Sequence, residues 1–202
     1  MYFRLIQQYV SLGHMQVVTA EELDIKPQYV LPHVVMKPES TTTKLRTLFD
    51  ASCRSRTGLS LNDILIAGPT IQDDIVCLIL RFRMYRFVVS ADIEKMLRQI
   101  LVHPSDQPLL RILWRGDKDS PLTTFQLLTV TYGTNSAPFL AACTLQKLAD
   151  DEESRFPVST PVVRNDVYVD NLLTGADNIS DLIVVCDQLI RIMNASSSMV
   201  VE

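Results

Sequence analysis

The sequence predicts an α+β fold, in which strands and helices mix without the strict alternation of a parallel α/β protein. Three observations support this prediction. Apolar segments bounded by turn-forming residues are typical of strands at 32–50, 87–91, 109–131 and 162–174. Helical patterns are separated by these segments and are strongest at 71–85 and 180–193. The 202 residues, 47% of them hydrophobic and 21% charged, suffice for one large domain or two small ones with a real core.

The first third of the chain is predicted to contain a helix and a hairpin. Residues 1–13 form a short helix that ends at Gly13, with an apolar face of Leu5, Ile6, Tyr9 and Val10. Residues 15–31 look irregular. Two strands follow within 32–50, on either side of a polar turn at 38–42, and residues 51–69 form a loop with glycine and proline as breakers.

The strongest helix is predicted at about 71–85. Thr70 and Asp73 form a capping box at its start. Its C-terminal end carries three arginines, where positive charge suits the helix dipole, and these are interpreted as dipole partners on a solvated surface: Arg81, Arg83 and Arg86.

The rest of the chain alternates short strands with helical stretches. A strand at 87–91 ends at Asp92, and a brief helical stretch follows to about Gln99. Strands at 109–115 and 123–131 flank a charged turn, and Ser136 could cap a helix from about 138 to 151. Residues 162–174 form a hairpin. The last helix, at about 180–193, is expected to turn four residues inward, namely Leu182, Cys186, Leu189 and Met193.

Composition limits the compartment and the partners. The net charge of −4 is a poor global signature for a nucleic-acid binder. The four cysteines form no CxxC pair, which favours reduced thiols over a zinc site or a disulfide framework. The chain has neither a signal-peptide pattern nor an apolar run of about 18 residues. We therefore expect an intracellular protein, in the cytoplasm or nucleus, without a membrane partner.

Two acidic residues end or turn apolar strands. Asp92 follows the strand at 87–91, and Asp170 lies at the tip of the 162–174 hairpin, within Tyr168-Val169-Asp170-Asn171. Carboxylates held at neighbouring strand ends can bind hard divalent cations. Such residues are also common turn formers, and Asp170-Asn171 would make a good two-residue hairpin loop because Asn tolerates positive φ.

Several segments in order resemble the fingers and palm motifs of reverse transcriptases. They are Lys37, the stretch from Lys44 to Asp50, Ala91 to Met96, Thr131 to Phe139 and Tyr168 to Asn171. The chain is most similar to the Bel/Pao group of long-terminal-repeat retrotransposons, through Leu31-Pro32-His33, Ser40 to Arg46, Ser60 to Asp63, Gly68-Pro69-Thr70, Ala91 to Met96 and Leu172 to Asp177. The resemblance extends from about Tyr9 to Met193. It implies a right-hand polymerase fold with a helical lead-in at 1–30, a fingers-like part at 31–86 and a palm-like part at 87–202, truncated before the thumb.

The resemblance also implies roles for individual residues. Asp92 and Asp170 would bind two Mg²⁺ (or Mn²⁺) ions, with the Ile93 carbonyl as a possible further ligand. A second set would lie at the nucleotide or its triphosphate: Lys37, Lys44, Arg46, Tyr132 and Gly133, with Asp50 orienting the basic residues. Gly133 would let the backbone approach the nucleic acid closely. The implied partners are an RNA or DNA template with its primer and deoxynucleoside triphosphates; self-association is left open.

Three departures from the family bear on activity. Asn171 replaces the second Asp of the YxDD motif, so the metal site loses one negative charge. Leu97 stands where the family has an aromatic residue under the sugar; it is either a loosened sugar gate or a core residue. The sequence also stops before the next palm segment. We therefore expect a reverse transcriptase domain fragment (an RNA-directed DNA polymerase) with little or no activity. The alternatives are a non-enzymatic remnant that keeps the fold, or an unrelated α+β binding domain.

Overall fold

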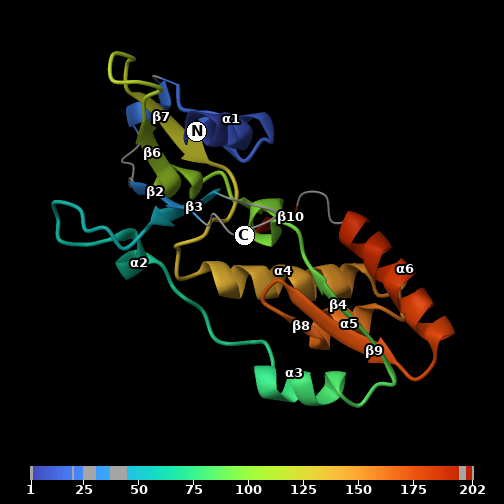
Figure 1. Cartoon of the computed structure of the whole chain (residues 1–202). Helices are drawn as coiled ribbons and strands as arrows, with labels where there is room; N and C mark the ends of the chain where they lie inside the picture. Colours follow the sequence, from blue (N-terminus) through green and yellow to red (C-terminus); the bar gives the residue numbers. More distant parts are fainter. Residues whose placement is uncertain (1, 20, 25–30, 37–44, 196–198, 202) are drawn as a thin grey trace. The chain divides into compact units, whose positions relative to one another are not determined.

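The computed structural model describes residues 2–19, 21–24, 31–36, 45–195 and 199–201. The chain forms two compact units, each assembled from separate stretches of sequence (Figure 1). Unit 1 contains residues 1–67, 100–137 and 200–202, and unit 2 contains residues 68–99 and 138–199. This division does not test the predicted boundaries at 31 and 87, which stay predictions. The fingers-like and palm-like assignment stays a prediction.

Unit 1 is built from short strands with helical turns between them. In chain order its elements are α1 (Tyr2–Ser11), β1 (Met15–Val17), η1 (Glu21–Asp24), β2 (Leu31–Met36), β3 (Leu45–Asp50), α2 (Leu61–Ile64), β5 (Ile100–Val102), η3 (Gln107–Leu110), β6 (Arg111–Trp114) and β7 (Thr123–Leu127). One sheet has the order β1-β7-β6, β2 and β3 form a hairpin, and β5 pairs with β10 (Met199–Val201). Its core includes Ile6, Tyr9, Phe49, Leu61, Ile112 and Leu127.

The structure confirms the predicted helix α1, the β2–β3 hairpin and the strands β6 and β7. The prediction that residues 15–31 are irregular is wrong at Met15–Val17, which form strand β1. This strand forms because Met15–Val17 pairs with Phe125–Leu127, a partner more than 100 residues away. The predicted loop at 51–69 contains α2, whose start is a capping box between Ser60 and Asp63. Hydrogen bonds from Ser60 lower the pKa of Asp63. The polar turn at 38–42 lies outside the described residues.

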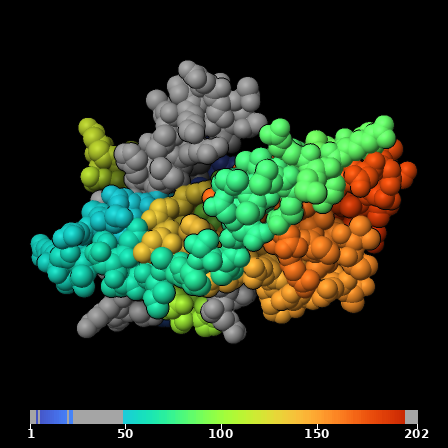
Figure 2. Space-filling view, turned by 90° about the horizontal axis from the view of Figure 1, so that it is seen from below, coloured from blue at the N-terminus to red at the C-terminus, as the bar shows by residue number. Residues whose placement is uncertain are grey.

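Unit 2 is a three-stranded antiparallel sheet with helices packed on it. Its elements are α3 (Ile75–Phe82), β4 (Phe87–Asp92), η2 (Met96–Gln99), α4 (Ala137–Glu152), α5 (Thr160–Asn165), β8 (Val167–Tyr168), β9 (Asn171–Ala176) and α6 (Ile179–Ala195). The strand order is β4-β9-β8, with α3 packed against β9 and α6 against both β4 and β9. In the space-filling view, α3 (green) forms an exposed surface of unit 2 beside the orange segment that carries α5 and the β8–β9 hairpin (Figure 2).

The predicted start of α3 is wrong. The helix begins at Ile75, and Asp74 caps it by accepting a hydrogen bond from the Val76 N–H at 2.7 Å. Asp73 instead forms an ion pair with Arg81 at 2.8 Å. Several neighbouring residues here, Thr70, Asp73 and Asp74, are of types that start helices, so the sequence permits more than one start. The ion pair between Asp73 and Arg81 accompanies the later one.

Two other elements of unit 2 differ from prediction. Residues 162–165, predicted in the first hairpin strand, belong to α5 (Thr160–Asn165), since Pro161 suits the first turn of a helix. In α6 the buried residues are Val185, Leu189 and Ile192, whereas the predicted inward residues other than Leu189 are half-buried. The helix therefore turns a slightly different face to the sheet.

Candidate active site

Strand β4, strand β9 and the turn before β9 bring together the three residues predicted to be catalytic. In the antiparallel register Asp92, the last residue of β4, lies opposite Asn171, the first residue of β9. Opposite residues share one face of a sheet. The Ile93 N–H donates to the Asp170 carbonyl at 2.8 Å, which fixes the hairpin tip beside the end of β4. Asp92, Asp170 and Asn171 therefore gather at one end of the unit 2 sheet.

The hairpin turn differs from the predicted Asp170-Asn171 loop by one residue. Asn171 pairs with Tyr168, so the two loop residues are Val169 and Asp170. Positive φ falls on Val169, at 56°, and not on Asn171. The Asn side chain is thus placed in the sheet register opposite Asp92, where an Asp would stand in the YxDD motif. Its position is set by strand pairing and does not depend on the turn preference of Asn.

The side chains at this end of the sheet are two carboxylates and one amide, which together carry two negative charges. Asp92 is exposed and Asp170 half-buried, and the Asn171 side-chain N–H donates to the Asp170 carboxylate at 3.1 Å. Glu94 is paired with Lys95 at 2.5 Å, and this ammonium lowers the pKa of Glu94. Among the described residues, no group of three or more His, Cys, Asp or Glu side chains could hold a metal. Two carboxylates and an amide oxygen are hard donors that fit Mg²⁺ or Mn²⁺, with one charge fewer than a three-carboxylate site.

A network of ionic and hydrogen-bonded side chains around the buried Asp166 contacts the hairpin. Asp166, which precedes β8, is buried and accepts a hydrogen bond from the Thr174 hydroxyl of β9 at 2.7 Å. Arg81 of α3 lies 3.4 Å from the same carboxylate and also donates to the Asn165 carbonyl. Hydrogen bonding to Asp73 is the main cause that raises the pKa of Arg81. Arg81 lies in the last turn of α3, as predicted for a dipole partner, and its contacts with Asn165 and Asp166 also link α3 to the segment before β8.

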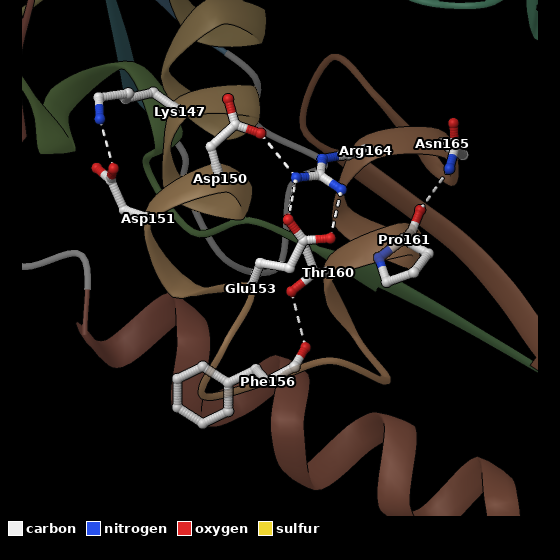
Figure 3. Close-up of polar contacts among 9 residues, drawn as sticks. All are labelled: Lys147, Asp150, Asp151, Glu153, Phe156, Thr160, Pro161, Arg164 and Asn165. Atoms are coloured by element: carbon white, nitrogen blue, oxygen red, sulfur yellow. Dashed lines mark hydrogen bonds and ion pairs between the residues drawn. The ribbon is translucent and has the colours of Figure 1, made fainter.

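A second arginine joins α5 to the end of α4. The Arg164 guanidinium reaches Asp150 at 2.7 Å and Glu153 at 3.2 Å (Figure 3). The two carboxylates raise the pKa of Arg164, with Glu153 as the larger cause. Exposed pairs of this kind contribute about 0–1 kcal/mol each. Their role is to fix the short helix that leads into the hairpin.

The cavity next to these arginines is not the candidate site. It has a volume of about 300 Å³ and is lined by Ile71, Asp73, Gln146, Asp150, Arg164 and Asn165. Asp92, Asp170 and Asn171 do not line it. The acids on its wall, Asp73 and Asp150, are already paired with Arg81 and Arg164. The sheet end with its two carboxylates is the better candidate on chemical grounds.

Two of the predicted nucleotide residues, Tyr132 and Gly133, lie in a loop of unit 1. Tyr132 accepts a hydrogen bond from the Phe49 N–H at 3.2 Å through its carbonyl, so the Tyr132–Gly133 loop lies against the end of β3. Gly133 has φ +107°, and a Cβ added there would lie 1.9 Å from the Phe49 carbonyl oxygen. The protein's own backbone therefore requires glycine at this position, a reason that the sequence prediction lacked.

The remaining predicted residues are described in part. Arg46 lies in β3 opposite Val35, and the structure describes its backbone but not its side chain. Lys37 and Lys44 lie outside the described residues. Leu97 lies half-buried in η2, next to the buried Met96. Its function at the sugar stays a prediction. Unit 2 thus holds the acidic set with Ile93 and Leu97, and unit 1 holds Arg46, Tyr132 and Gly133.

Sequence reasoning missed one residue that organises the unit 1 loop. The Asn62 side chain donates to the Gly133 carbonyl at 3.0 Å and accepts from the Asn135 N–H at 2.9 Å. The Asn135 side chain returns a bond to the Asn62 carbonyl at 2.9 Å. Asn62 belongs to a segment that carries the family resemblance, Ser60 to Asp63, but its type and spacing gave no sign of this long-range role.

Comparisons with known proteins support the fold and leave the family open. No protein-family model matches the chain, and no curated protein matches it. The chain is similar to the solved structure of a foamy viral protease–reverse transcriptase, dRH, in complex with double-stranded DNA, with a TM-score of 0.67 and 16% identity. The match covers 95% of this chain and 29% of that one. No helix in the described residues is long and apolar enough to cross a membrane. The chain has a reverse transcriptase-like fold.

Proposed function

We propose that this chain is a reverse transcriptase domain fragment of a Bel/Pao-type retrotransposon polyprotein, with RNA-directed DNA polymerase activity strongly reduced by Asn171. The observation that carries the proposal is the pairing of Asp92 with Asn171, together with the 2.8 Å hydrogen bond from Ile93 to Asp170. This pairing brings residues of two motifs, 79 positions apart in sequence, together at one end of a sheet. The quoted sequence segments are the basis for the Bel/Pao assignment.

The proposed chemistry is nucleotidyl transfer. When bound, two divalent cations would activate the primer hydroxyl and offset the charge of the triphosphate. Asp92 and Asp170 would bind the cations, and the Ile93 carbonyl could add a ligand. Arg46, Lys37 and Lys44 would bind the triphosphate. The duplex DNA named with the foamy viral structure supports a template–primer duplex as the nucleic-acid partner of this chain.

Asn171 sets the expected level of activity. Its amide oxygen can ligate a cation, but it carries no charge, and its N–H group donates to Asp170. That bond withdraws electron density from one of the two carboxylates. Even changes outside the ligand set lower metal affinity or activity by about 10–100-fold. We expect at least that loss here.

Primer extension with Mg²⁺ and with Mn²⁺, on RNA and DNA templates, tests the proposal. Asn171→Asp should raise extension at least about tenfold over the unmodified chain. Ser154→Asp is the control, because it adds the same charge in unit 2 at an exposed position away from the hairpin. Adding Asp92→Asn to Asn171→Asp should abolish the gain. Extension by the unmodified chain that equals that of Asn171→Asp would contradict the proposal.

The alternative is a non-enzymatic remnant that keeps the fold and at most binds nucleic acid. Asn171 itself is the observation that favours it. The alternative predicts no primer extension by the unmodified chain or by Asn171→Asp. It also predicts that the two proteins bind duplex nucleic acid equally well.

A further inference from the structure

The tip of the candidate active-site hairpin has a backbone conformation that its sequence does not favour. Val169 has φ 56°, in the left-handed region. A β-branched residue is an outlier there, because its Cβ crowds the following carbonyl. A conformation of this kind persists where surrounding contacts impose it. Val169 directly precedes Asp170, so whatever holds Val169 also sets the direction of the Asp170 side chain.

Gln72 is the side chain that contacts the backbone on both sides of Tyr168. Its Nε2 donates to the Val167 carbonyl at 3.3 Å, and its Oε1 accepts from the Val169 N–H at 3.2 Å. One primary amide supplies both the donor and the acceptor. Gln72 is half-buried, so these bonds are partly shielded from water. The two bonds together fix the backbone where it enters the left-handed turn.

The segment that carries Gln72 is itself anchored. Asp73 is paired with Arg81 at 2.8 Å, and Asp74 caps α3. Arg81 in turn contacts the Asn165 carbonyl and Asp166, just before β8. On the opposite side, the Ile93 N–H holds the Asp170 carbonyl at 2.8 Å. The hairpin tip is therefore held by two contacts: Gln72 bonds the Val169 N–H, and the Ile93 N–H, just after β4, bonds the Asp170 carbonyl.

We propose that Gln72 is a positioning residue of the candidate active site, which holds Val169 in its left-handed conformation and thereby keeps Asp170 directed toward the shared cation site with Asp92. The part that concerns the cation rests on the proposed function; the part that concerns the hairpin backbone does not. Gln72 needs to touch neither cation nor nucleotide for this role. Loss of its amide should loosen the tip and leave the sheet pairing of Asp92 with Asn171 in place.

Amide hydrogen exchange followed by NMR tests the backbone part on the full chain without metal. In Gln72→Met, which keeps the side-chain length and removes the amide, exchange of the Val169 N–H should quicken about tenfold. Exchange of the Ile93 N–H should change less than twofold. Gln188→Met is the matched control: like Gln72, Gln188 forms two hydrogen bonds with backbone groups of unit 2, in its case by accepting from the N–H groups of Val158 and Ser159, and it lies away from the hairpin.

Mn²⁺ binding by electron paramagnetic resonance, on the same proteins, tests the positioning part. Gln72→Met should raise the Mn²⁺ Kd about tenfold, as other supporting contacts of metal sites do, and Gln188→Met should not. Adding Val169→Gly should restore the affinity, because glycine adopts positive φ without a Cβ. A general loss of structure would not be rescued in this way.

The outcomes separate this inference from the proposed function. Unchanged Val169 exchange in Gln72→Met overturns the inference, whatever the metal does. Quickened exchange with an unchanged Mn²⁺ Kd overturns the positioning role. If the unmodified chain binds no Mn²⁺, the proposed function fails at its metal site, and the exchange result still decides the backbone part. Should Gln72→Met not fold, slow exchange of the Gln72 side-chain amide protons in the unmodified chain supports the inference, and fast exchange overturns it.

Discussion

Several residues of the described chain have positive φ, and two of them, Gly133 and Val169, reach it in opposite ways. In unit 1, Gly133 has φ +107° in the loop that carries Tyr132. In unit 2, Val169 has φ 56° in the loop that carries Asp170. At the first position the residue suits the backbone, and at the second it does not. The left-handed turn of unit 2 is imposed by contacts from other elements, namely Gln72 and the Ile93 N–H.

At Gly133 the residue type itself permits the positive φ, whereas at Val169 contacts from other parts of unit 2 impose it. Gly133 is required by steric fit, since the Phe49 carbonyl occupies the space of a Cβ. Val169 is held by hydrogen bonds that could open and close. The unit 1 loop should therefore fail through loss of folding stability, whereas the unit 2 tip should fail through loss of local order and of its ligand geometry.

The largest effect on stability is expected at Gly133. Gly133→Ala puts a Cβ 1.9 Å from backbone oxygen, in a left-handed conformation, and should lower the free energy of unfolding by about 3 kcal/mol or more. Gly58→Ala is the control, since Gly58 has φ +84° and no described heavy atom within 4 Å of an added Cβ. It should cost about 1 kcal/mol. Urea unfolding measures both; equal losses would mean that the close approach to Phe49 has no consequence.

The next largest effect concerns the support behind the hairpin. Asp166→Ala leaves Arg81 and the buried Thr174 hydroxyl without a shared partner, and should cost about 2–3 kcal/mol. Asp150→Ala removes an exposed partner of Arg164 and should cost at most about 1 kcal/mol. Thermal and urea unfolding of the two variants would contradict the ranking if Asp150→Ala proved as damaging.

The smallest effect is expected at the strained tip itself. Val169→Gly removes the strain of a β-branched residue at positive φ, which stabilises the folded state by about 1 kcal/mol. Glycine also makes the unfolded chain more flexible, which costs about 1 kcal/mol, so the two contributions nearly cancel. Unfolding stability should stay within about 0.5 kcal/mol of the unmodified chain. Val88→Gly removes an exposed valine from β4 and should cost about 1 kcal/mol. A larger loss at Val169 than at Val88 would show that Val169 is not strained.

Local sequence patterns predicted much of the secondary structure. Strands β4, β6 and β7 and the helices α1, α4 and α6 follow from apolar runs and helical spacing, and Asp92 was correctly placed at a strand end. Patterns failed where a distant partner decides the outcome. Strand β1 depends on β7, and the start of α3 accompanies the pairing of Asp73 with Arg81.

The candidate site was predictable in its residues and less so in its geometry. The order of the motifs predicted Asp92, Asp170 and Asn171 as site residues, and the structure places them at one end of a sheet, while their catalytic role stays a prediction. Turn preferences put the hairpin loop one residue too late, at Asp170-Asn171. The supporting residues Gln72, Asn62 and Asp166 have long-range partners, with 71 to 97 positions between Gln72 or Asn62 and the groups that they contact. No local pattern marks such residues.

The most direct test of the shared cation site is a Mn²⁺ titration of the full chain by electron paramagnetic resonance. Asp92→Asn and Asp170→Asn should each weaken binding at least about tenfold, because each removes a charged ligand. Asp117→Asn is the control: Asp117 is also an acid in a turn between strands, but its carboxylate accepts the N–H groups of Asp119 and Ser120. Its substitution should leave the Kd unchanged. Binding that survives both Asp92→Asn and Asp170→Asn unchanged would contradict the account.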